Sequence, residues 1–337
     1  MAAILRIDKA LNTPVYQQII NSILSRIEDG SLLMGSQLPS INQVAGDYSL
    51  ARETVVKAFK ILQEKGIISP VQGKGFYVSS VEFKIENRIF LFFDTFSAYK
   101  EVIYNALKDR IGAGSFIDIY YHHFNFRMFE KLIRESAGNY QSYVIIPMEN
   151  ERLGEVLKIL PPDKLYLLDI KPELSEVNFP GVYQNFEEDI FQSLMSVVDL
   201  CRKYSRLILV FRNQITDPPS GIVTGFNRFC SANQFDSQII RTSLTKRKLQ
   251  HGEAYIVIDD EDLVYLVEHA RNSNLQIGQE LGILSYNETP LKKIAANGIS
   301  VMSTDYAEMG IRIAEMVITR SKELEYNTFR FINRGSF

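Results

Sequence analysis

From residue 87 onward, the sequence alternates between short apolar runs of strand length and longer segments with helical periodicity. The runs are NRIFLFFD, SFIDIYYH, SYVIIP, KLYLLD, SRLILVF, AYIVID and LGILSY. Helical patterns alternate with them at 98–111, 127–137, 150–159, 187–203, 262–273 and 306–320. Strands that alternate with helices indicate a parallel sheet with helices on both faces. There are enough runs for two such sheets, so residues 89–337 are predicted to form a two-lobed α/β domain.

The first 79 residues follow a different pattern. Helical periodicity and end signals predict helices at 14–30, 41–47 and about 51–65, with Ser40 as the N-cap of the second. The β-rich runs IISPV and FYVSS then flank QGKG, which predicts a hairpin. Two short helices joined by a tight turn are an arrangement that places the second helix in the DNA major groove. We therefore expect a winged helix–turn–helix (α+β) domain at 1–79, a linker at 80–88, and the α/β domain after it.

The helix predicted at 51–65 opens with side chains suited to DNA. Arg52, Glu53 and Thr54 stand at its start, where they would reach base edges and phosphates, and Lys57 follows one turn later. Lys74 lies between two glycines in the hairpin, and glycines let the backbone approach a phosphate closely. The predicted DNA-binding residues are Ser40, Asn42, Arg52, Glu53, Thr54, Lys57, Gln72, Gly73 and Lys74.

Charge and composition set weaker bounds. Residues 1–80 hold 8 Lys and Arg against 6 Asp and Glu, whereas the rest of the chain is acidic, and the whole has a formal charge of −3. The two cysteines, Cys201 and Cys230, have no motif spacing, which favours reduced thiols in a cytoplasmic protein. The start of the sequence is not typical of a signal peptide, and no apolar run approaches the ~18 residues of a membrane span. We expect a cytoplasmic protein without a membrane partner.

The stretch from Pro14 to Val78 closely resembles the winged helix–turn–helix of the GntR family of bacterial regulators. The matching residues are Pro14, Tyr16, Gln18, Gly30, Gly35, Leu38-Pro39-Ser40, Ala45, Arg52, Thr54-Val55, Gly66 and Gly73-Lys74-Gly75. The resemblance implies a DNA-binding transcriptional regulator. One position departs from it: the family usually has an arginine that contacts DNA two residues after this serine, and this chain has Asn42.

Residues 81–337 resemble the effector domain of LacI-family repressors and the periplasmic sugar-binding proteins. The order of elements matches in GVYQNFEEDIFQSLMSVVDL, GIVTGFNRFC, IVIDDEDLVYLVEHARNSNLQIGQELGILSYNET and TDYAEMGIRIAEMVI. A GntR-type head on a LacI-like body is the layout of the arabinose-repressor group. That layout implies a homodimer that binds operator DNA and responds to a sugar or sugar phosphate in the cleft between the lobes, with arabinose or fucose as first candidates by analogy.

Ligands of open α/β sheets bind beyond the carboxyl ends of strands. Polar groups there suit sugar hydroxyls, and an aromatic face suits the C–H side of the ring. The resemblance places Asn185, Asp259, Asn287 and Thr304 at ligand contacts. It also marks a departure, since the family commonly has an arginine where this chain has Ile222. The predicted effector-binding residues are Asp94, Phe96, Ser97, His122, Glu149, Tyr183, Asn185, Asp259, Asn287 and Thr304.

Other interpretations stay open for several of these motifs. The acidic turn DDED after residue 258 is also typical of a solvated helix start, because carboxylates favour the helix dipole. Arg212 or Arg228 could supply the donor that Ile222 lacks. YYHH has no third metal ligand at a known spacing, so no metal is expected. No catalytic motif is present, so neither an enzyme nor a cofactor is expected. The alternatives are a regulator with a pyridoxal-phosphate enzyme-like body, or a cytoplasmic sugar-binding protein.

Overall fold

The computed structural model describes residues 5–8, 13–81, 87–173, 178–212 and 220–337. The chain divides into two compact units, which are Met1–Phe92 with Gly112–Leu165 (unit 1) and Phe93–Ile111 with Tyr166–Phe337 (unit 2). The boundary expected between a head at 1–79 and a body at 89–337 falls inside unit 1. Residues 82–86 of the expected linker lie outside the described part of the chain. The division into head and body therefore stays a prediction.

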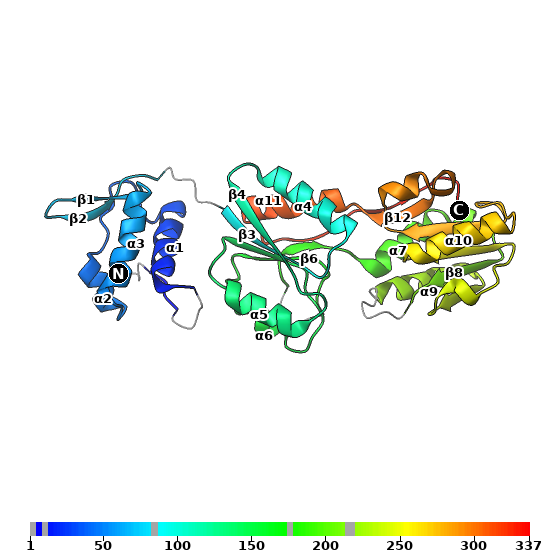
Figure 1. The fold of residues 1–337 in the computed structure, drawn as a ribbon, viewed down its shortest axis with the longest axis horizontal. Coiled ribbons are helices and arrows are strands. Elements are labelled where there is room, and N and C mark those ends of the chain that lie inside the picture. Colours follow the sequence, from blue (N-terminus) through cyan, green and yellow to red (C-terminus); the bar gives the residue numbers. More distant parts are fainter. Residues whose placement is uncertain (1–4, 9–12, 82–86, 174–177, 213–219) are drawn as a thin grey trace. The chain divides into compact units, whose positions relative to one another are not determined.

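The N-terminal part of unit 1 forms the predicted helices and hairpin (Figure 1). Its elements are α1 (Val15–Glu28), α2 (Ile41–Asp47), α3 (Arg52–Glu64), β1 (Ile68–Val71) and β2 (Gly75–Val78). The apolar positions with helical spacing in α1 and α3, among them Ile19, Val55 and Phe59, are buried in one core. β1 and β2 pair antiparallel, with Ile68 opposite Val78. This confirms the winged helix–turn–helix fold.

The described remainder of unit 1 supplies strands of the first α/β sheet and helices that alternate with them. They are β3 (Asn87–Phe93), β4 (Ser115–Tyr121), α5 (Phe126–Ser136), β5 (Ser142–Ile145) and α6 (Leu153–Leu157). β3 and β5 pair in parallel, with Ile89 opposite Ser142. Residues 89–93 of β3 and all of β5 are buried, as expected of strands covered on both faces.

Unit 2 begins with α4 (Ala98–Ile111), β6 (Leu165–Asp169) and β7 (Gly181–Tyr183), and returns to them late in the sequence through α11 (Tyr306–Thr319) and β13 (Leu324–Tyr326). The first sheet has the strand order β13-β7-β6-β5-β3-β4. Helix α11 packs closely on α4 (Figure 1). A Cβ atom added to Gly310 of α11 would lie 2.5 Å from the backbone oxygen of Ile103, so this contact requires glycine.

The second sheet lies wholly in unit 2 and has the strand order β14-β12-β11-β10-β8-β9. Its strands are β8 (Arg206–Val210), β9 (Ser237–Ile240), β10 (Glu253–Val257), β11 (Leu281–Tyr286), β12 (Ser300–Thr304) and β14 (Phe329–Ile332). All pairs are parallel except β12 with β14. Its helices are α7 (Phe186–Met195), α8 (Val198–Cys201), α9 (Gly221–Asn233) and α10 (Asp260–Asn272), and three short 3-10 helices are η1 (Leu244–Lys246), η2 (Pro290–Lys293) and η3 (Ala295–Asn297).

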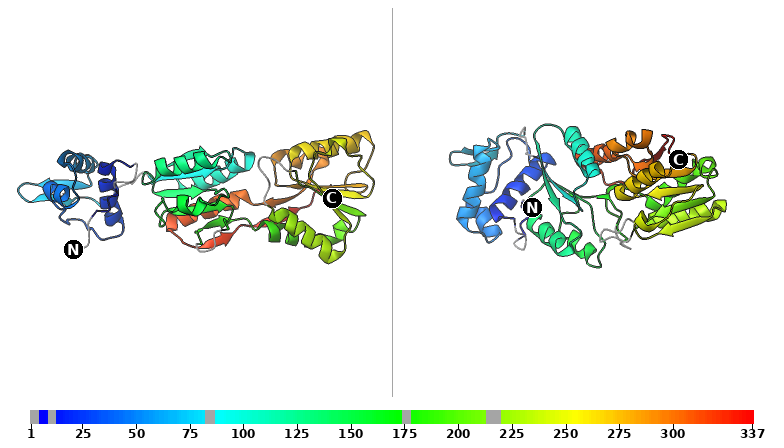
Figure 2. Two further views of the ribbon diagram at one scale, coloured as in Figure 1. Left: turned by 90° about the horizontal axis from the view of Figure 1, so that it is seen from below. Right: turned by 45° about the vertical axis from the view of Figure 1, so that its right-hand side comes forward.

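Helices cover both faces of this second sheet, with α10 on one face and α7 and α9 on the other (Figure 2). Alternate residues of β8 serve the two faces: Leu209 packs in one core with Phe226 of α9, and Ile208 packs in the other with Leu266 of α10. The predicted α/β class is confirmed. In the described residues, no helix is long and apolar enough to cross a membrane.

Candidate functional site

The surface formed by α2, the turn after it and the start of α3 carries most of the predicted DNA contacts. Ser40 caps α2, since its side-chain oxygen accepts a hydrogen bond from the backbone N–H of Gln43 at 3.1 Å. Arg52 and Glu53 are exposed in the first turn of α3, and Thr54 is half-buried. The N-terminus of α3 therefore presents free backbone N–H groups and a guanidinium to solvent, which suits an anionic partner.

Asn42 and Arg52 are joined across the turn between α2 and α3. The Nε atom of Arg52 donates a hydrogen bond to Oδ1 of Asn42 at 3.2 Å, and both side chains are exposed. Asn42 is thus hydrogen-bonded to Arg52, an exposed cation of this surface.

Lys57, predicted to contact DNA, contacts an aromatic ring in this structure. Its Nζ atom lies 3.7 Å from the centre of the Tyr16 ring on α1, which is a cation–π geometry. The contact ties α3 to α1 and directs the ammonium toward that ring. Phosphate binding by Lys57 would therefore require its side chain to leave Tyr16.

The wing consists of β1, β2 and the turn between them. Gln72, Gly73 and Lys74 are exposed there, and Gly73 has a φ of 72°, which favours glycine. The backbone oxygen of Lys74 accepts a hydrogen bond from Nε2 of Gln37 at 2.7 Å. The turn is therefore anchored to the segment before α2 while the Lys74 ammonium remains exposed.

Two predicted effector residues lie in unit 1. His122 is fully buried, its ring packs edge-on against Phe92 and Phe129 at 5.2 and 5.4 Å, and its Nε2 atom lies 3.2 Å from the backbone oxygen of Ile146. Glu149 is exposed. His122 thus packs in the core of unit 1, whereas the side chain of Glu149 is exposed.

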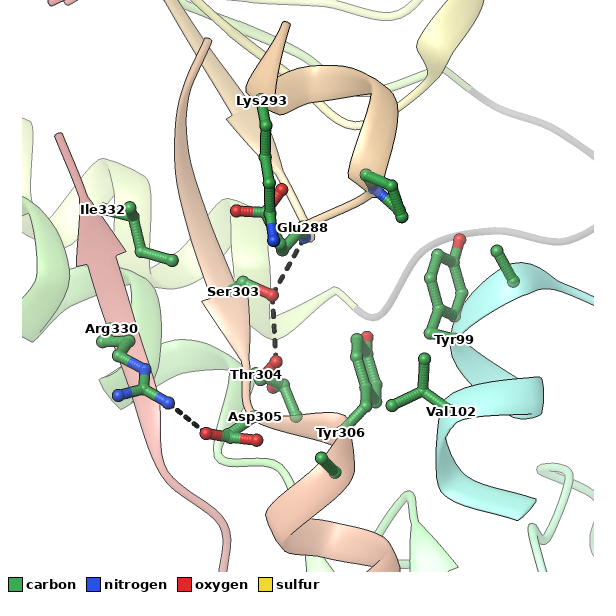
Figure 3. A pocket seen from close by; sticks show the side chains of 13 residues that line it. Tyr99, Val102, Glu288, Lys293, Ser303, Thr304, Asp305, Tyr306, Arg330 and Ile332 are labelled. Carbon is green, nitrogen blue, oxygen red and sulfur yellow. Dashed lines mark hydrogen bonds and ion pairs between the residues drawn. The ribbon is translucent and has the colours of Figure 1, made fainter. Parts of the chain in front are cut away.

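The other predicted effector residues lie in unit 2, which contains a pocket of about 270 Å³ (Figure 3). Its lining comes from the start of α4, the ends of β11 and β12, η2, the start of α11, and β14. The lining residues are Ala98, Tyr99, Val102, Glu288, Pro290, Lys293, Ser303, Thr304, Asp305, Tyr306, Ala307, Arg330 and Ile332. Thr304 is the predicted residue among them. The pocket stands at the carboxyl ends of parallel strands, where ligands of α/β sheets bind.

Two stacked tyrosines form the apolar wall of this pocket (Figure 3). The rings of Tyr99 and Tyr306 lie 5.1 Å apart with an 18° angle between their planes. The Tyr306 hydroxyl donates to Oδ1 of Asn287 at 2.9 Å, so the predicted residue Asn287 supports the wall. Burial raises the pKa of Tyr306 well above its usual range, so this hydroxyl keeps its proton near neutral pH.

Charged groups border the opposite side of the pocket. Arg330 forms an ion pair with Asp305, and Arg334 forms one with Glu288. Lys293 is exposed and extends past Glu288 in Figure 3. The pocket thus offers an aromatic face together with carboxylates and cations, a combination that suits a small polar ring.

A buried network supports the pocket from behind. Lys100 is 5% exposed, and its Nζ atom lies 2.8 Å from Asp169 and 3.4 Å from Asp94. Asp169 also accepts a hydrogen bond from the Gln184 side-chain amide, and Gln184 in turn accepts one from the Thr304 hydroxyl at 2.5 Å. Burial alone would lower the pKa of Lys100, but the two carboxylates outweigh it and raise that pKa. The predicted residues Asp94 and Thr304 are therefore connected through Lys100, Asp169 and Gln184.

Asp259 belongs to an acidic turn that is paired with Arg212. The guanidinium contacts Asp262 at 2.6 Å and Glu261 at 3.0 Å, and lies 3.9 Å from Asp259. Partial burial raises the pKa of Asp259, and Arg212 opposes that rise. Asp259 precedes α10 without a side-chain capping bond. The turn is therefore more than a solvated helix start, because it holds a nearly buried arginine.

Position 222, where the family commonly has an arginine, is occupied by Ile222. The isoleucine side chain has no hydrogen-bond donor and is buried in the core of unit 2. Arg228 is engaged elsewhere: it forms ion pairs with Glu187 and Glu188 and lies over the ring of Phe191. Arg212 is likewise engaged, by Glu261 and Asp262, and neither arginine is among the residues that line the pocket.

The remaining predicted residues are scattered around the start of α4 and α7. Tyr183 is buried and donates its hydroxyl proton to the backbone oxygen of Phe179. Phe96 is 71% exposed, and the Ser97 hydroxyl is buried without a hydrogen-bond partner in the described structure. Asn185 precedes α7, and its backbone N–H donates to Asp189. Of this group, none lines the pocket.

The pocket's aromatic wall and Arg330 were not predicted from the sequence. Tyr99 and Tyr306 each stand in the first turn of a correctly predicted helix, which was the available signal. Arg330 was missed because β14 was not predicted. Among the described residues, no cluster of three or more His, Cys, Asp or Glu side chains could hold a metal ion.

Comparison with protein families agrees with this architecture. Residues 15–78 match the family described as bacterial regulatory proteins, gntR family, and residues 201–332 match the periplasmic binding protein-like domain. The chain thus combines a GntR-type helix–turn–helix domain with a periplasmic-binding-protein-like domain.

Among curated proteins, the chain is similar to an arabinose metabolism transcriptional repressor of Geobacillus stearothermophilus, with 21% identity over 92% of both chains. It is also 39% identical to the HTH-type transcriptional repressor STM4068 of Salmonella typhimurium, over 77 residues. That match covers 23% of this chain and spans about a third (32%) of the Salmonella protein. The stronger identity is thus confined to the helix–turn–helix region.

Among solved structures, the lac repressor dimer bound to operator and the anti-inducer ONPF matches with a TM-score of 0.62. The match covers 75% of this chain and 94% of that one, at 12% identity. At this identity the likeness shows the fold alone, and that fold is LacI-like.

Proposed function

We propose that this protein is a DNA-binding transcriptional regulator whose DNA affinity is controlled by a sugar. The observation that carries the proposal is the presence, in one chain, of an exposed helix–turn–helix surface and a polar, tyrosine-walled pocket at the carboxyl ends of β11 and β12. The first suits DNA and the second suits a small polar ligand.

The helix–turn–helix surface has groups that can recognise base edges and groups that can bind DNA phosphates. Arg52 at the start of α3 can donate two hydrogen bonds to a guanine edge, and Lys74 in the wing can neutralise a phosphate. The similarity of this region to the transcriptional repressor STM4068 of Salmonella typhimurium supports this half of the proposal.

The pocket suits a monosaccharide. Its volume of about 270 Å³ is near the lower end of typical small-molecule sites. The tyrosine wall would face the C–H side of the ring, and Thr304, Asp305 and Glu288 would meet its hydroxyls. The end-to-end likeness to an arabinose metabolism repressor makes arabinose the first sugar to test, with fucose and sugar phosphates next. A phosphate would be met by Lys293 and Arg330.

A thermal-shift panel of monosaccharides and their phosphates tests the effector half. We expect one sugar to raise the melting temperature of the wild type, and Tyr306→Ala to abolish that rise. The matched control is Tyr326→Ala, which changes an exposed tyrosine outside the pocket. If every sugar leaves the melting temperature unchanged, the effector is of another class.

A homodimer with an inverted-repeat operator is part of the proposal. Helix–turn–helix regulators that pair read two half-sites, so operator symmetry mirrors protein symmetry. Sedimentation at micromolar concentration should give a dimer. A monomer with and without DNA would contradict this part alone.

The alternatives lose support for separate reasons. A pyridoxal-phosphate enzyme-like body does not agree with the LacI-like fold of the chain. A sugar-binding protein without regulatory function would have no use for the helix–turn–helix region. Salt-dependent binding to DNA upstream of its own gene would separate the regulator from both.

A further inference from the structure

Asn42 departs from the arginine that the resemblance to the GntR family implies, and the structure gives the asparagine a partner. Its Oδ1 atom accepts the Nε–H of Arg52 at 3.2 Å, although the two residues are ten positions apart on different helices. Within the described ranges, this is the hydrogen bond that the Arg52 guanidinium makes, and no ion pair involves it. The bond therefore decides where an otherwise unrestrained side chain points.

The choice of nitrogen matters. Guanidinium has five N–H donors, and recognition of a guanine edge uses the fork formed by its two terminal nitrogens. The hydrogen bond from Arg52 Nε to Asn42, called the brace below, leaves these two terminal nitrogens unoccupied. It also restricts the torsion angles of the long arginine side chain. Ordering such a side chain at an interface otherwise costs about 0.5–1.5 kcal/mol, which corresponds to roughly two- to tenfold in affinity.

Both partners are held by fixed elements. Asn42 lies in the first turn of α2, which the Ser40 cap secures, and Arg52 is the first residue of α3. Val44 of α2 and Val55 of α3 are buried in one core, so the helices that carry the brace are fixed relative to each other. The hydrogen bond thus joins two rigid helices.

We propose that Asn42 is a positioning residue that orients the Arg52 guanidinium for base recognition, in place of an arginine that would contact DNA itself. The inference rests on the proposed DNA-binding function. It predicts that Asn42 and Arg52 act at the same base pair and that Asn42 contributes little to phosphate binding.

Selection from a pool of random-sequence duplex DNA, followed by anisotropy titration, tests it. The wild type should select a motif with one position governed by Arg52, which Arg52→Ala identifies by losing that preference. Asn42→Ala should weaken the preference at the same position about two- to tenfold, with an unchanged salt slope. Asn42→Asp keeps the acceptor, so it should retain the preference while lowering affinity for all DNA. The double variant Asn42→Ala/Arg52→Ala should bind like Arg52→Ala.

Each contrary result has a distinct meaning. If Asn42→Ala changes a different base pair, or its effect adds to that of Arg52→Ala, then Asn42 contacts DNA directly and the positioning role is wrong. An unchanged motif in Asn42→Ala also overturns it. If the wild type selects no sequence, the proposed DNA-binding function fails and the brace fails with it. Gln43→Ala, which alters the adjacent exposed residue of α2, is the matched control.

Discussion

In the proposed function, Arg52 is the residue expected to contribute most to base recognition. Replacing it with alanine should cost about 1–3 kcal/mol in affinity for the selected DNA and relax the preference at one base pair. Lys74→Ala should instead weaken binding to every sequence and make the salt dependence shallower, because Lys74 offers a phosphate contact. Anisotropy titrations at several salt concentrations distinguish the two. Equal affinity of wild type and a folded Arg52→Ala variant would contradict the assignment.

Lys100 should be essential for the stability of unit 2. Lys100→Met removes the ammonium and leaves the carboxylates of Asp169 and Asp94 without it, and breaking a buried pair in this way costs about 3–5 kcal/mol. Urea unfolding measures the loss. Lys108→Met, which changes an exposed lysine on the same helix, should have little effect. A loss below about 1 kcal/mol in Lys100→Met would show that the network is not a structural support.

Asp189 should make stability depend on pH. Burial raises its pKa from the usual 3.8 to about 6, so the folded state holds the proton more tightly than the unfolded state. The stabilisation is present below about pH 4 and is lost as pH rises through about 6. Asp189→Asn should remove this part of the decline, as measured by urea unfolding between pH 4 and 7. Parallel pH profiles for wild type and variant would contradict the shift.

At the scale of elements, Gly310 tests the close contact of α11 with α4. A Cβ atom there would lie 2.5 Å from the backbone oxygen of Ile103 and 2.8 Å from the Cβ of Ala106. Gly310→Ala should therefore destabilise the protein by about 1–3 kcal/mol through overpacking. Gly46→Ala, in a helix with no atom within 4 Å of the new methyl group, should be neutral or stabilising. A stabilising Gly310→Ala in thermal unfolding would refute the close packing.

Elements with strong periodicity were predictable from the sequence, and weakly patterned ones were not. The helix expected at 98–111 is α4 at those bounds, because Ile103 and Leu107 repeat on one face. The helix expected at 187–203 is instead two helices, which separate at Ser196 and Val197. β12 was missed because SVMST has neither alternation nor a long apolar run, and its burial comes from neighbouring strands.

The candidate site was predictable only in part, because its main interactions join distant residues. Strand ends pointed to Asp94 and Asn287, and the resemblance to LacI-family effector domains pointed to Thr304. In the structure Thr304 lines the pocket, Asn287 accepts a hydrogen bond from its tyrosine wall, and Asp94 pairs with Lys100. The pairing of Lys100 with Asp169 spans 69 positions and has no local signature. The helix–turn–helix fold was easier to predict, since a short segment of the chain contains all of its elements.

At the scale of the whole molecule, control of DNA affinity by a sugar requires that sugar binding and DNA binding affect each other. A ligand shifts an equilibrium only by its difference in affinity for the two states. The resulting coupling is reciprocal, and typical values are about 1–3 kcal/mol, or roughly 5- to 150-fold.

Calorimetric titration of the sugar that raises the melting temperature, with and without the selected DNA, tests this claim most directly. DNA should change the sugar's dissociation constant by the same factor by which the sugar changes the dissociation constant of DNA. Tyr306→Ala should bind DNA normally and show no response to the sugar. Identical sugar affinity in the presence and absence of saturating DNA would contradict the account, because the two functions would then be independent.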